Sequence, residues 1–317
     1  MINIKRKAII FGIKGTMLTK AEKALLKEEK PWGIILFSRN IENILQLKKL
    51  ITDIRNKMHD KKYPILIDQE GGRINRLSKF IDTSKFTGEF FGNLYKNNFK
   101  KFTTYYQIYI MQTCYLMNMI GVNINTVPIL DVRRKKSHNI IGDRSFSTNP
   151  KIVSKVGDFC IKEFHNNSIG TVIKHIPGHG LAKVDSHKAT PLVKDKLRKL
   201  NKIDFFSFKN KKSLFAMTAH IIYKDIDRIY TATHSKKIIS LIRNKIKFEN
   251  LLISDDISMK SLKFPIKLNI NKAFNAGCNL VLHCNGKYNE MITVAENSPK
   301  INDFIIKKTS QFYKILS

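Results

Sequence analysis

The chain has 317 residues, of which 43% are hydrophobic, and its formal net charge is +32. This composition is too apolar for a disordered chain, no run of about 18 apolar residues could span a bilayer, and the length fits one large domain over residues 1–317. The lysines are scattered from end to end. We therefore favour a compositional bias over a surface that binds nucleic acid or anionic wall fragments, and we assign no function from the charge.

Short β-branched apolar segments alternate with longer amphipathic segments, a pattern typical of βα units around a parallel sheet. The predicted strands cover residues 7–12, 33–37, 65–67, 122–126, 171–173, 214–217, 251–253 and 279–282. The predicted helices include residues 20–28, 44–58, 102–119, 151–166, 235–245 and 291–296. About eight such units, in a chain somewhat longer than the ~250 residues typical of the fold, predict an α/β protein with a single (β/α)8 TIM-type barrel. The prediction leaves room for irregularity in the first strands.

The structural alternative is an open, doubly wound sheet. Two features disfavour it, because no GxGxxG turn follows the first predicted strand and polar residues follow nearly every strand. In a closed barrel the loops after the strands converge on one rim, where active sites lie, so these polar strand ends predict an enzyme. They are residues 68–73, Asn125 and Asp131, Lys174 and His175, His220, Asp255 and Asp256, and residues 283–285.

The segment 174–187 gathers an unusual number of reactive groups. Within 14 residues it holds the imidazoles of His175, His179 and His187, the ammonium of Lys174 and the carboxylate of Asp185. Histidine has an unperturbed pKa near neutrality, which suits proton transfer, whereas three clustered imidazoles also suit a zinc ion. Proton transfer is favoured, because Lys174 would add positive charge beside a metal. Two glycines within the segment predict a flexible span.

Four motifs occur in a defined order along the chain. They are IDQEGGRINRL at 67–77, IGDRSF at 141–146, KHIPGHG followed by DSH within 174–187, and LISDDISM at 252–259. Together they resemble the motifs of family 3 glycoside hydrolases, specifically the bacterial β-N-acetylglucosaminidases of cell-wall recycling. Segments at 123–132, 217–227 and 273–285 are similar to further family segments in the same order. One motif alone would be weak evidence, but the ordered set is very specific.

The resemblance implies roles for three residues in catalysis. Asp255 is implied as the nucleophile that attacks the anomeric carbon and forms a glycosyl-enzyme ester. His187 is implied as the general acid/base and Asp185 as the residue that orients it, where most glycosidases use a second carboxylic acid. We expect Asp256 to point away from the pocket and to accept hydrogen bonds from backbone amides.

The resemblance also implies a set of residues that contact the non-reducing N-acetylglucosamine. They are Asp68, Arg76, Arg144, Lys174 and His175. Carboxylates accept hydrogen bonds from sugar hydroxyls, whereas arginine and lysine donate to hydroxyl or amide oxygens. For Glu70, Arg73, Asp131 and Asp143 two interpretations stay open, direct contact with the sugar and mutual ion pairing that holds the rim loops. His220 is interpreted as a structural histidine.

The resemblance implies a retaining exo-β-N-acetylglucosaminidase that removes terminal N-acetylglucosamine from muropeptide-derived disaccharides. It would need no cofactor and no metal, and its partner would be a carbohydrate, with no specific nucleic acid and no membrane. We expect a monomer or weak dimer in the cytoplasm, since the four cysteines lack CxxC spacing. Two alternatives remain, a phosphorylase that uses phosphate in place of water, and a barrel that has lost catalysis and binds wall fragments or polyanions.

Overall fold

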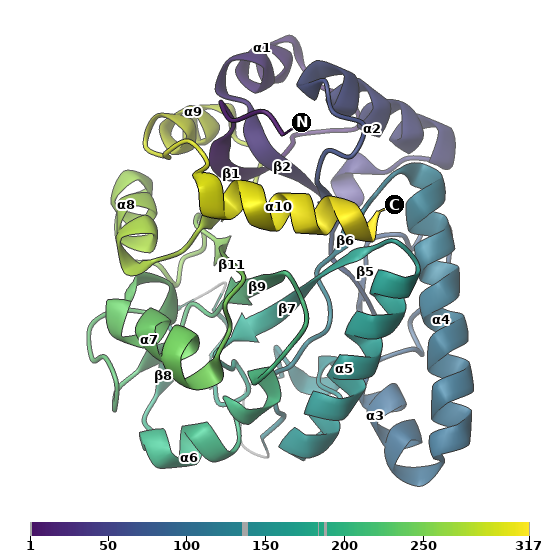
Figure 1. The fold of residues 1–317 in the computed structure, drawn as a ribbon, viewed down its shortest axis with the longest axis vertical. Helices are drawn as coiled ribbons and strands as arrows, with labels where there is room; N and C mark the ends of the chain where they lie inside the picture. Colours follow the sequence, from purple (N-terminus) through teal and green to yellow (C-terminus); the bar gives the residue numbers. More distant parts are fainter. Residues whose placement is uncertain (1, 135–138, 183, 187–188, 317) are drawn as a thin grey trace.

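Eight parallel strands close into a barrel in the residues that the computed structural model describes, which are 2–134, 139–182, 184–186 and 189–316 (Figure 1). The order around the barrel is β1-β12-β11-β9-β7-β6-β3-β2. Every neighbouring pair is parallel. The predicted (β/α)8 barrel is therefore confirmed, and the open doubly wound sheet is excluded.

Each predicted strand overlaps one strand of the barrel. These strands are β1 (Lys7–Gly12), β2 (Pro31–Leu36), β3 (Ile65–Ile67), β6 (Ile124–Asn125), β7 (Gly170–Ile176), β9 (Phe215–Thr218), β11 (Leu251–Asp256) and β12 (Leu280–His283). Two small sheets lie outside the barrel: β4 (Gln69–Gly71) with β5 (Ile74–Asn75), and β8 (Leu192–Val193) with β10 (Ile222–Tyr223). The expected irregularity is present, because the β1–β2 register shifts between Lys7 and Ile10.

Helices surround the barrel and include four that the sequence analysis did not predict, namely α3, α6, α8 and α10. The full set is α1 (Lys20–Glu29), α2 (Ile44–Met58), α3 (Gly88–Asn97), α4 (Phe99–Ile120), α5 (Pro150–Asn166), α6 (Leu197–Lys202), α7 (Lys236–Leu241), α8 (Ile266–Ala276), α9 (Tyr288–Glu296) and α10 (Asp303–Ile315). A π-helix, Ile242–Ile246, continues α7. No helix in the described part of the chain is long and apolar enough to cross a membrane.

The strands are hydrophobic on both faces because the barrel buries both. In β1, Ala8 and Ile10 pack inside the barrel with Trp32 of β2. Ile9 and Phe11 belong to the second core, which also holds the buried residues of the surrounding helices. Alternate side chains of a strand point to opposite faces, so a single apolar run supplies two cores. This explains why the strands appear in the sequence as unbroken apolar segments.

Helix α10 closes the N-terminal end of the barrel, and Figure 1 shows it lying across the ring of strands. Its Phe312 ring meets Phe215 edge-on at 5.5 Å between centroids. Its Thr309 hydroxyl accepts a hydrogen bond of 2.8 Å from the buried Trp32 indole. Just before the helix, Ile301 donates from its amide to the carbonyl of Arg6, which precedes β1. The opposite end of the barrel, where the strands terminate, is left for the functional site.

Thr309→Val is expected to destabilise the fold. The substitution keeps the side-chain shape but leaves the indole N–H of Trp32 buried without its acceptor, which costs about 1–2 kcal/mol of unfolding free energy. Urea denaturation followed by circular dichroism measures this change. The control is Thr104→Val, the same substitution on the exposed face of α4, which should change stability by less than about 0.5 kcal/mol. Equal effects of the two substitutions would contradict the role given to Thr309.

Candidate active site

A cavity of about 410 Å³ lies at the C-terminal ends of the barrel strands. It brings together residues that are far apart in the sequence, including the proposed nucleophile and all five predicted sugar-binding residues. The predicted residues among its lining are Asp68, Arg76, Arg144, Lys174, His175 and Asp255. Ser186 also lines the cavity, and Asp185 beside it is half-buried, with its main-chain carbonyl accepting from the amide of Ala189. His187 lies outside the described residues.

Asp255 and Asp256 form the end of strand β11. The Asp256 amide donates to a carboxylate oxygen of Asp255 at 2.8 Å. The Asp256 carboxylate accepts from the amide and hydroxyl of Ser258, at 3.1 and 2.8 Å, and from the Cys284 amide at 3.2 Å. The predicted binding of backbone amides by Asp256 is therefore confirmed. The expectation that Asp256 points away is wrong, because this residue also lines the cavity.

A buried lysine links two carboxylates on one wall of the cavity. The Lys174 ammonium, whose side chain is only 3% exposed, lies 2.9 Å from Asp68 and 2.7 Å from Glu70. It also donates to the Thr126 hydroxyl at 2.8 Å, and Thr126 donates to Asp68. Asp68 follows β3 directly and Lys174 lies near the end of β7, so the barrel closure creates this contact. Arg76 adds a longer contact of 3.4 Å to Asp68.

The charges in this cluster are fixed at neutral pH. Burial favours neutral forms, but the paired charges outweigh it, so the pKa of Lys174 is raised and the pKa of Asp68 is lowered well below its ordinary value. Burial likewise opposes ionisation of Glu70, yet Arg144 and Lys174 lower its pKa to about 2. Groups with such pKa values do not exchange protons near pH 7. The cluster is suited to hold hydroxyl and amide groups in place, and proton transfer falls to other residues.

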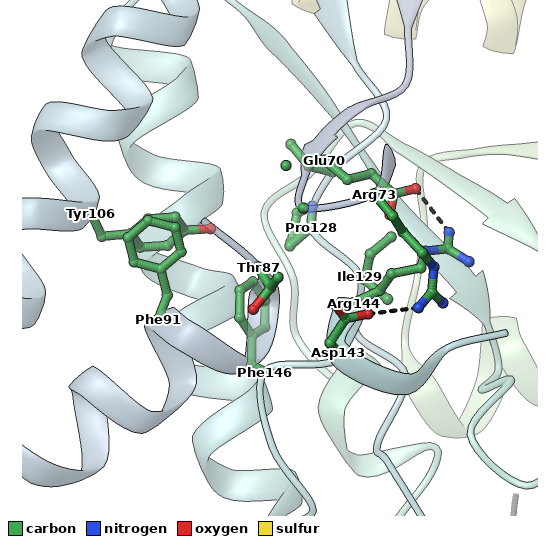
Figure 2. Close-up of a pocket in the computed structure, with 14 residues that line it drawn as sticks. Glu70, Arg73, Thr87, Phe91, Tyr106, Pro128, Ile129, Asp143, Arg144 and Phe146 are labelled. Atoms are coloured by element: carbon green, nitrogen blue, oxygen red, sulfur yellow. Dashed lines mark hydrogen bonds and ion pairs between the residues drawn. The ribbon is translucent and has the colours of Figure 1, made fainter. Parts of the chain in front are cut away.

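Figure 2 shows two arginine–carboxylate pairs beside this wall, next to a smaller cavity of about 20 Å³. Arg144 donates two hydrogen bonds to Glu70, of 2.7 and 2.8 Å, and the two side chains are only 11% and 4% exposed. Arg73 pairs with Asp143 at 2.7 Å, but these side chains are 42% and 36% exposed. Mutual ion pairing is thus present at both positions. The buried two-point pair fixes the Arg144 guanidinium far more firmly than the exposed pair fixes Arg73.

Asp131 anchors the start of the loop that follows β7. Its fully buried carboxylate accepts from the His175 ring at 2.7 Å, from the His175 amide at 3.2 Å and from the His179 amide at 2.6 Å. Burial acts to raise the pKa of Asp131, but His175 outweighs it and the net pKa is lowered. A buried carboxylate with three donors holds His175 and the following loop in one arrangement.

The two glycines of this loop allow close packing, and the expected flexibility of the span stays a prediction. A Cβ at Gly180 would lie 1.9 Å from the Val132 carbonyl oxygen, so only glycine fits there. The Gly178 carbonyl accepts from the Tyr223 hydroxyl. Between them, the His179 ring is buried, 3.3 Å from the Ser186 hydroxyl, and burial, with the nearby His175, lowers its pKa to about 4. His179 is therefore neutral at physiological pH and supports the loop.

The described residues contain no group of three or more His, Cys, Asp or Glu side chains placed to hold a metal ion. The zinc alternative includes His187, which lies outside these residues, so it stays a hypothesis. His220 is fully buried, with its ring nitrogens 2.7 Å from the Thr233 hydroxyl and 3.0 Å from the Asp256 carbonyl. Its interpretation as a structural histidine is confirmed.

The sequence analysis missed several residues that line the cavity. They are Phe37, Arg39, Met217 and Met259. Arg39 follows the end of β2, so the rule that polar residues follow strands could have found it. The two methionines carried no such signal, because apolar side chains near strand ends are equally typical of a core.

Comparison with known proteins places the chain in a family. The glycosyl hydrolase family 3 N-terminal domain matches residues 7–309. The β-hexosaminidase of Haemophilus ducreyi is 32% identical over 290 residues, covering 87% of this chain and 81% of the relative. The β-hexosaminidase of Thioalkalivibrio sulfidiphilus is 28% identical over 284 residues, covering 87% and 80%. The crystal structure of NagZ from Neisseria gonorrhoeae with N-trifluoroacetyl-D-glucosamine has a TM-score of 0.88 and 26% identity, covering 98% of this chain and 91% of that chain. The chain therefore belongs to glycosyl hydrolase family 3.

Proposed function

We propose that the protein is a retaining exo-β-N-acetylglucosaminidase that acts on muropeptide-derived disaccharides during cell-wall recycling in the cytoplasm. One observation carries the proposal: a single cavity joins Asp255 to the Lys174 cluster with Asp68 and Glu70. The β-hexosaminidase relatives support the sugar specificity. The whole chain is proposed as one catalytic domain that needs no cofactor.

In the proposed reaction, Asp68, Arg76, Arg144, Lys174 and His175 bind the non-reducing sugar. The Asp255 carboxylate attacks the anomeric carbon through an oxocarbenium-like transition state, while His187 donates a proton to the departing glycosidic oxygen. His187 then removes a proton from water, which attacks the anomeric carbon and releases the sugar from the aspartyl ester. Asp185 would orient the His187 imidazole and stabilise its protonated form.

Release of nitrophenol from nitrophenyl N-acetyl-β-glucosaminide, compared with the matching β-glucoside, tests the proposal. We expect turnover of the N-acetylglucosaminide with a strong preference over the glucoside, and retention of the β configuration in the first-formed sugar. Product analysis with and without phosphate separates hydrolysis from phosphorolysis, since a phosphorylase would release sugar 1-phosphate. Absence of turnover on both substrates, or equal turnover of both, would contradict the proposed specificity.

Arg144→Lys is expected to weaken catalysis without unfolding the protein. A lysine ammonium cannot reproduce the two parallel hydrogen bonds to Glu70, so the sugar-binding donor loses its fixed position. We expect kcat/KM to fall about 10- to 100-fold. The matched control is Arg133→Lys, which changes an exposed pair with Glu89 outside the cavity and should alter kcat/KM by less than about twofold. Equal losses in the two variants would refute the distinction between the pairs.

A further inference from the structure

Two arginines are proposed to bind the sugar, and hydrogen bonds hold Arg76 far more weakly than Arg144. Arg144 donates two hydrogen bonds to Glu70, of 2.7 and 2.8 Å. In the described part of the chain, the Arg76 guanidinium donates one hydrogen bond, of 3.4 Å, to Asp68, and its Nε has no hydrogen-bond partner. A long side chain with one such contact can adopt several rotamers, so a further contact is needed to fix Arg76 at the cavity.

The aromatic ring of Phe37 supplies such a contact. The Arg76 Cζ lies over this ring, 5.5 Å from its centroid. Phe37 directly follows β2 and lines the same cavity as Arg76. A guanidinium within about 6 Å of a ring centroid is attracted to the negative face of the ring. Phe37 therefore adds an attraction for Arg76 that Asp68 alone does not provide.

The backbone that carries the Phe37 ring is itself firmly held. The Phe37 amide donates to the Asn40 side chain at 2.9 Å, and the Phe37 carbonyl accepts from the Asn40 amide at 2.8 Å. Asn40 is fully buried, and its side chain donates to the carbonyls of Ile13 and Gly15 at 3.1 and 2.9 Å. These bonds tie the end of β2 to the loop after β1. The ring is therefore a fixed surface on which a mobile arginine can rest.

A second arginine lies over the same ring. The Arg39 Cζ is 4.7 Å from the Phe37 centroid, and the Arg39 guanidinium donates to the carbonyls of Ile13, at 2.9 Å, and Cys284. Burial, with the positive charge of Arg76, lowers the pKa of Arg39, so the two cations lie close together. Like charges repel, and an aliphatic side chain at position 37 would attract neither cation. The arrangement of two guanidiniums around position 37 therefore requires an aromatic face.

We propose that Phe37 is a positioning residue that holds the Arg76 guanidinium at the sugar site through its aromatic face. The inference rests on the proposed glycosidase function, in which Arg76 binds the non-reducing sugar. Loss of the aromatic face would weaken sugar binding while every charge and hydrogen-bonding group of the site stays in the chain. Phe37 also lines the cavity, so the experiment has to separate action through Arg76 from direct stacking of the ring on the sugar.

Phenylalanines that carry one, two or three ring fluorines, introduced at position 37 by amber suppression, test the role of the aromatic face. Fluorine withdraws electron density from the ring and weakens its attraction for a cation, but it changes the side-chain shape little. We expect kcat/KM for nitrophenyl N-acetyl-β-glucosaminide to fall stepwise, to about one tenth with three fluorines. The Kd of N-acetylglucosamine, which occupies only the sugar site, should rise in parallel. The same series at Phe90, an exposed ring outside the cavity, is the control and should change both values by less than about twofold.

Arg76→Gln separates action through Arg76 from direct contact with the sugar. This substitution removes the cation and should by itself lower kcat/KM about 100-fold. In the Arg76→Gln protein the fluorine series at Phe37 should change kcat/KM by less than about twofold, because the ring no longer has this cation to hold. A stepwise loss that persists in Arg76→Gln would overturn the proposal, as would a wild-type series that does not depend on the number of fluorines. A wild-type protein that neither cleaves the substrate nor binds N-acetylglucosamine would instead overturn the proposed function, and the role of Phe37 with it.

Discussion

Asp255→Asn should reduce hydrolysis by on the order of 10⁴-fold while leaving the fold intact. An amide cannot form the glycosyl ester and cannot stabilise the positive charge that develops at the anomeric carbon. Asp255 lies near the end of β11 and accepts a hydrogen bond from the amide of the next residue. Asparagine has nearly the same shape as aspartate, so the substitution disturbs little packing. Initial rates with the nitrophenyl substrate measure the loss, and circular dichroism checks the fold.

Substitution of the neighbouring Asp256 is the control that distinguishes the loss of a nucleophile from the loss of a structural residue. Asp256→Asn weakens the hydrogen bonds that this side chain accepts from the Ser258 and Cys284 amides, so it should lower stability as well as activity.

Azide should restore turnover to Asp255→Gly by taking the place of the missing carboxylate, and it should give the α-glycosyl azide. A fluorinated sugar that slows ester hydrolysis should add its mass to the peptide containing Asp255. Labelling of Asp256, or azide rescue at that position alone, would reassign the nucleophile.

Asp131→Asn should both destabilise the protein and lower its activity. The Asp131 carboxylate accepts hydrogen bonds from N–H groups of His175 and His179. An asparagine would turn its own NH₂ group toward some of these donors, and it carries no negative charge beside His175. We expect a loss of about 3 kcal/mol in unfolding free energy. We also expect kcat/KM to fall about 100-fold, because His175 and the loop leading to Asp185 lose their anchor. Urea denaturation and steady-state kinetics measure the two effects.

The stability lost in Asp131→Asn should depend on pH. Folding lowers the pKa of Asp131, so its charge contributes stability that is fully present above the unfolded pKa of about 4 and is lost as pH falls through the folded pKa. The stability difference between wild type and variant should therefore be constant from about pH 5 to pH 8 and shrink below about pH 4. The control Asp53→Asn, on the exposed face of α2, should change stability by less than about 0.5 kcal/mol. An undiminished difference at low pH would show that Asp131 acts through packing alone.

Much of the barrel follows from local patterns. The strands are buried on both faces, so β1, β3 and β11 appear as short apolar runs that end in polar residues, and this pattern is visible without any tertiary contact. Helix α10 was missed for a physical reason. Its apolar face covers the end of the barrel, where it packs on Trp32 and Phe215, and only the closed ring of strands creates that surface.

The sequence by itself determined the barrel, the family and the residues that gather at one rim, because strand ends and ordered motifs are local properties of the chain. Only the tertiary structure decided which charges pair. Glu70 binds Arg144 and Lys174, whereas Arg73 binds Asp143 near the surface. It also decided that Gly180, after β7, packs closely against the Val132 carbonyl. These outcomes depend on distances between strands that are far apart in sequence, and closing the barrel sets those distances.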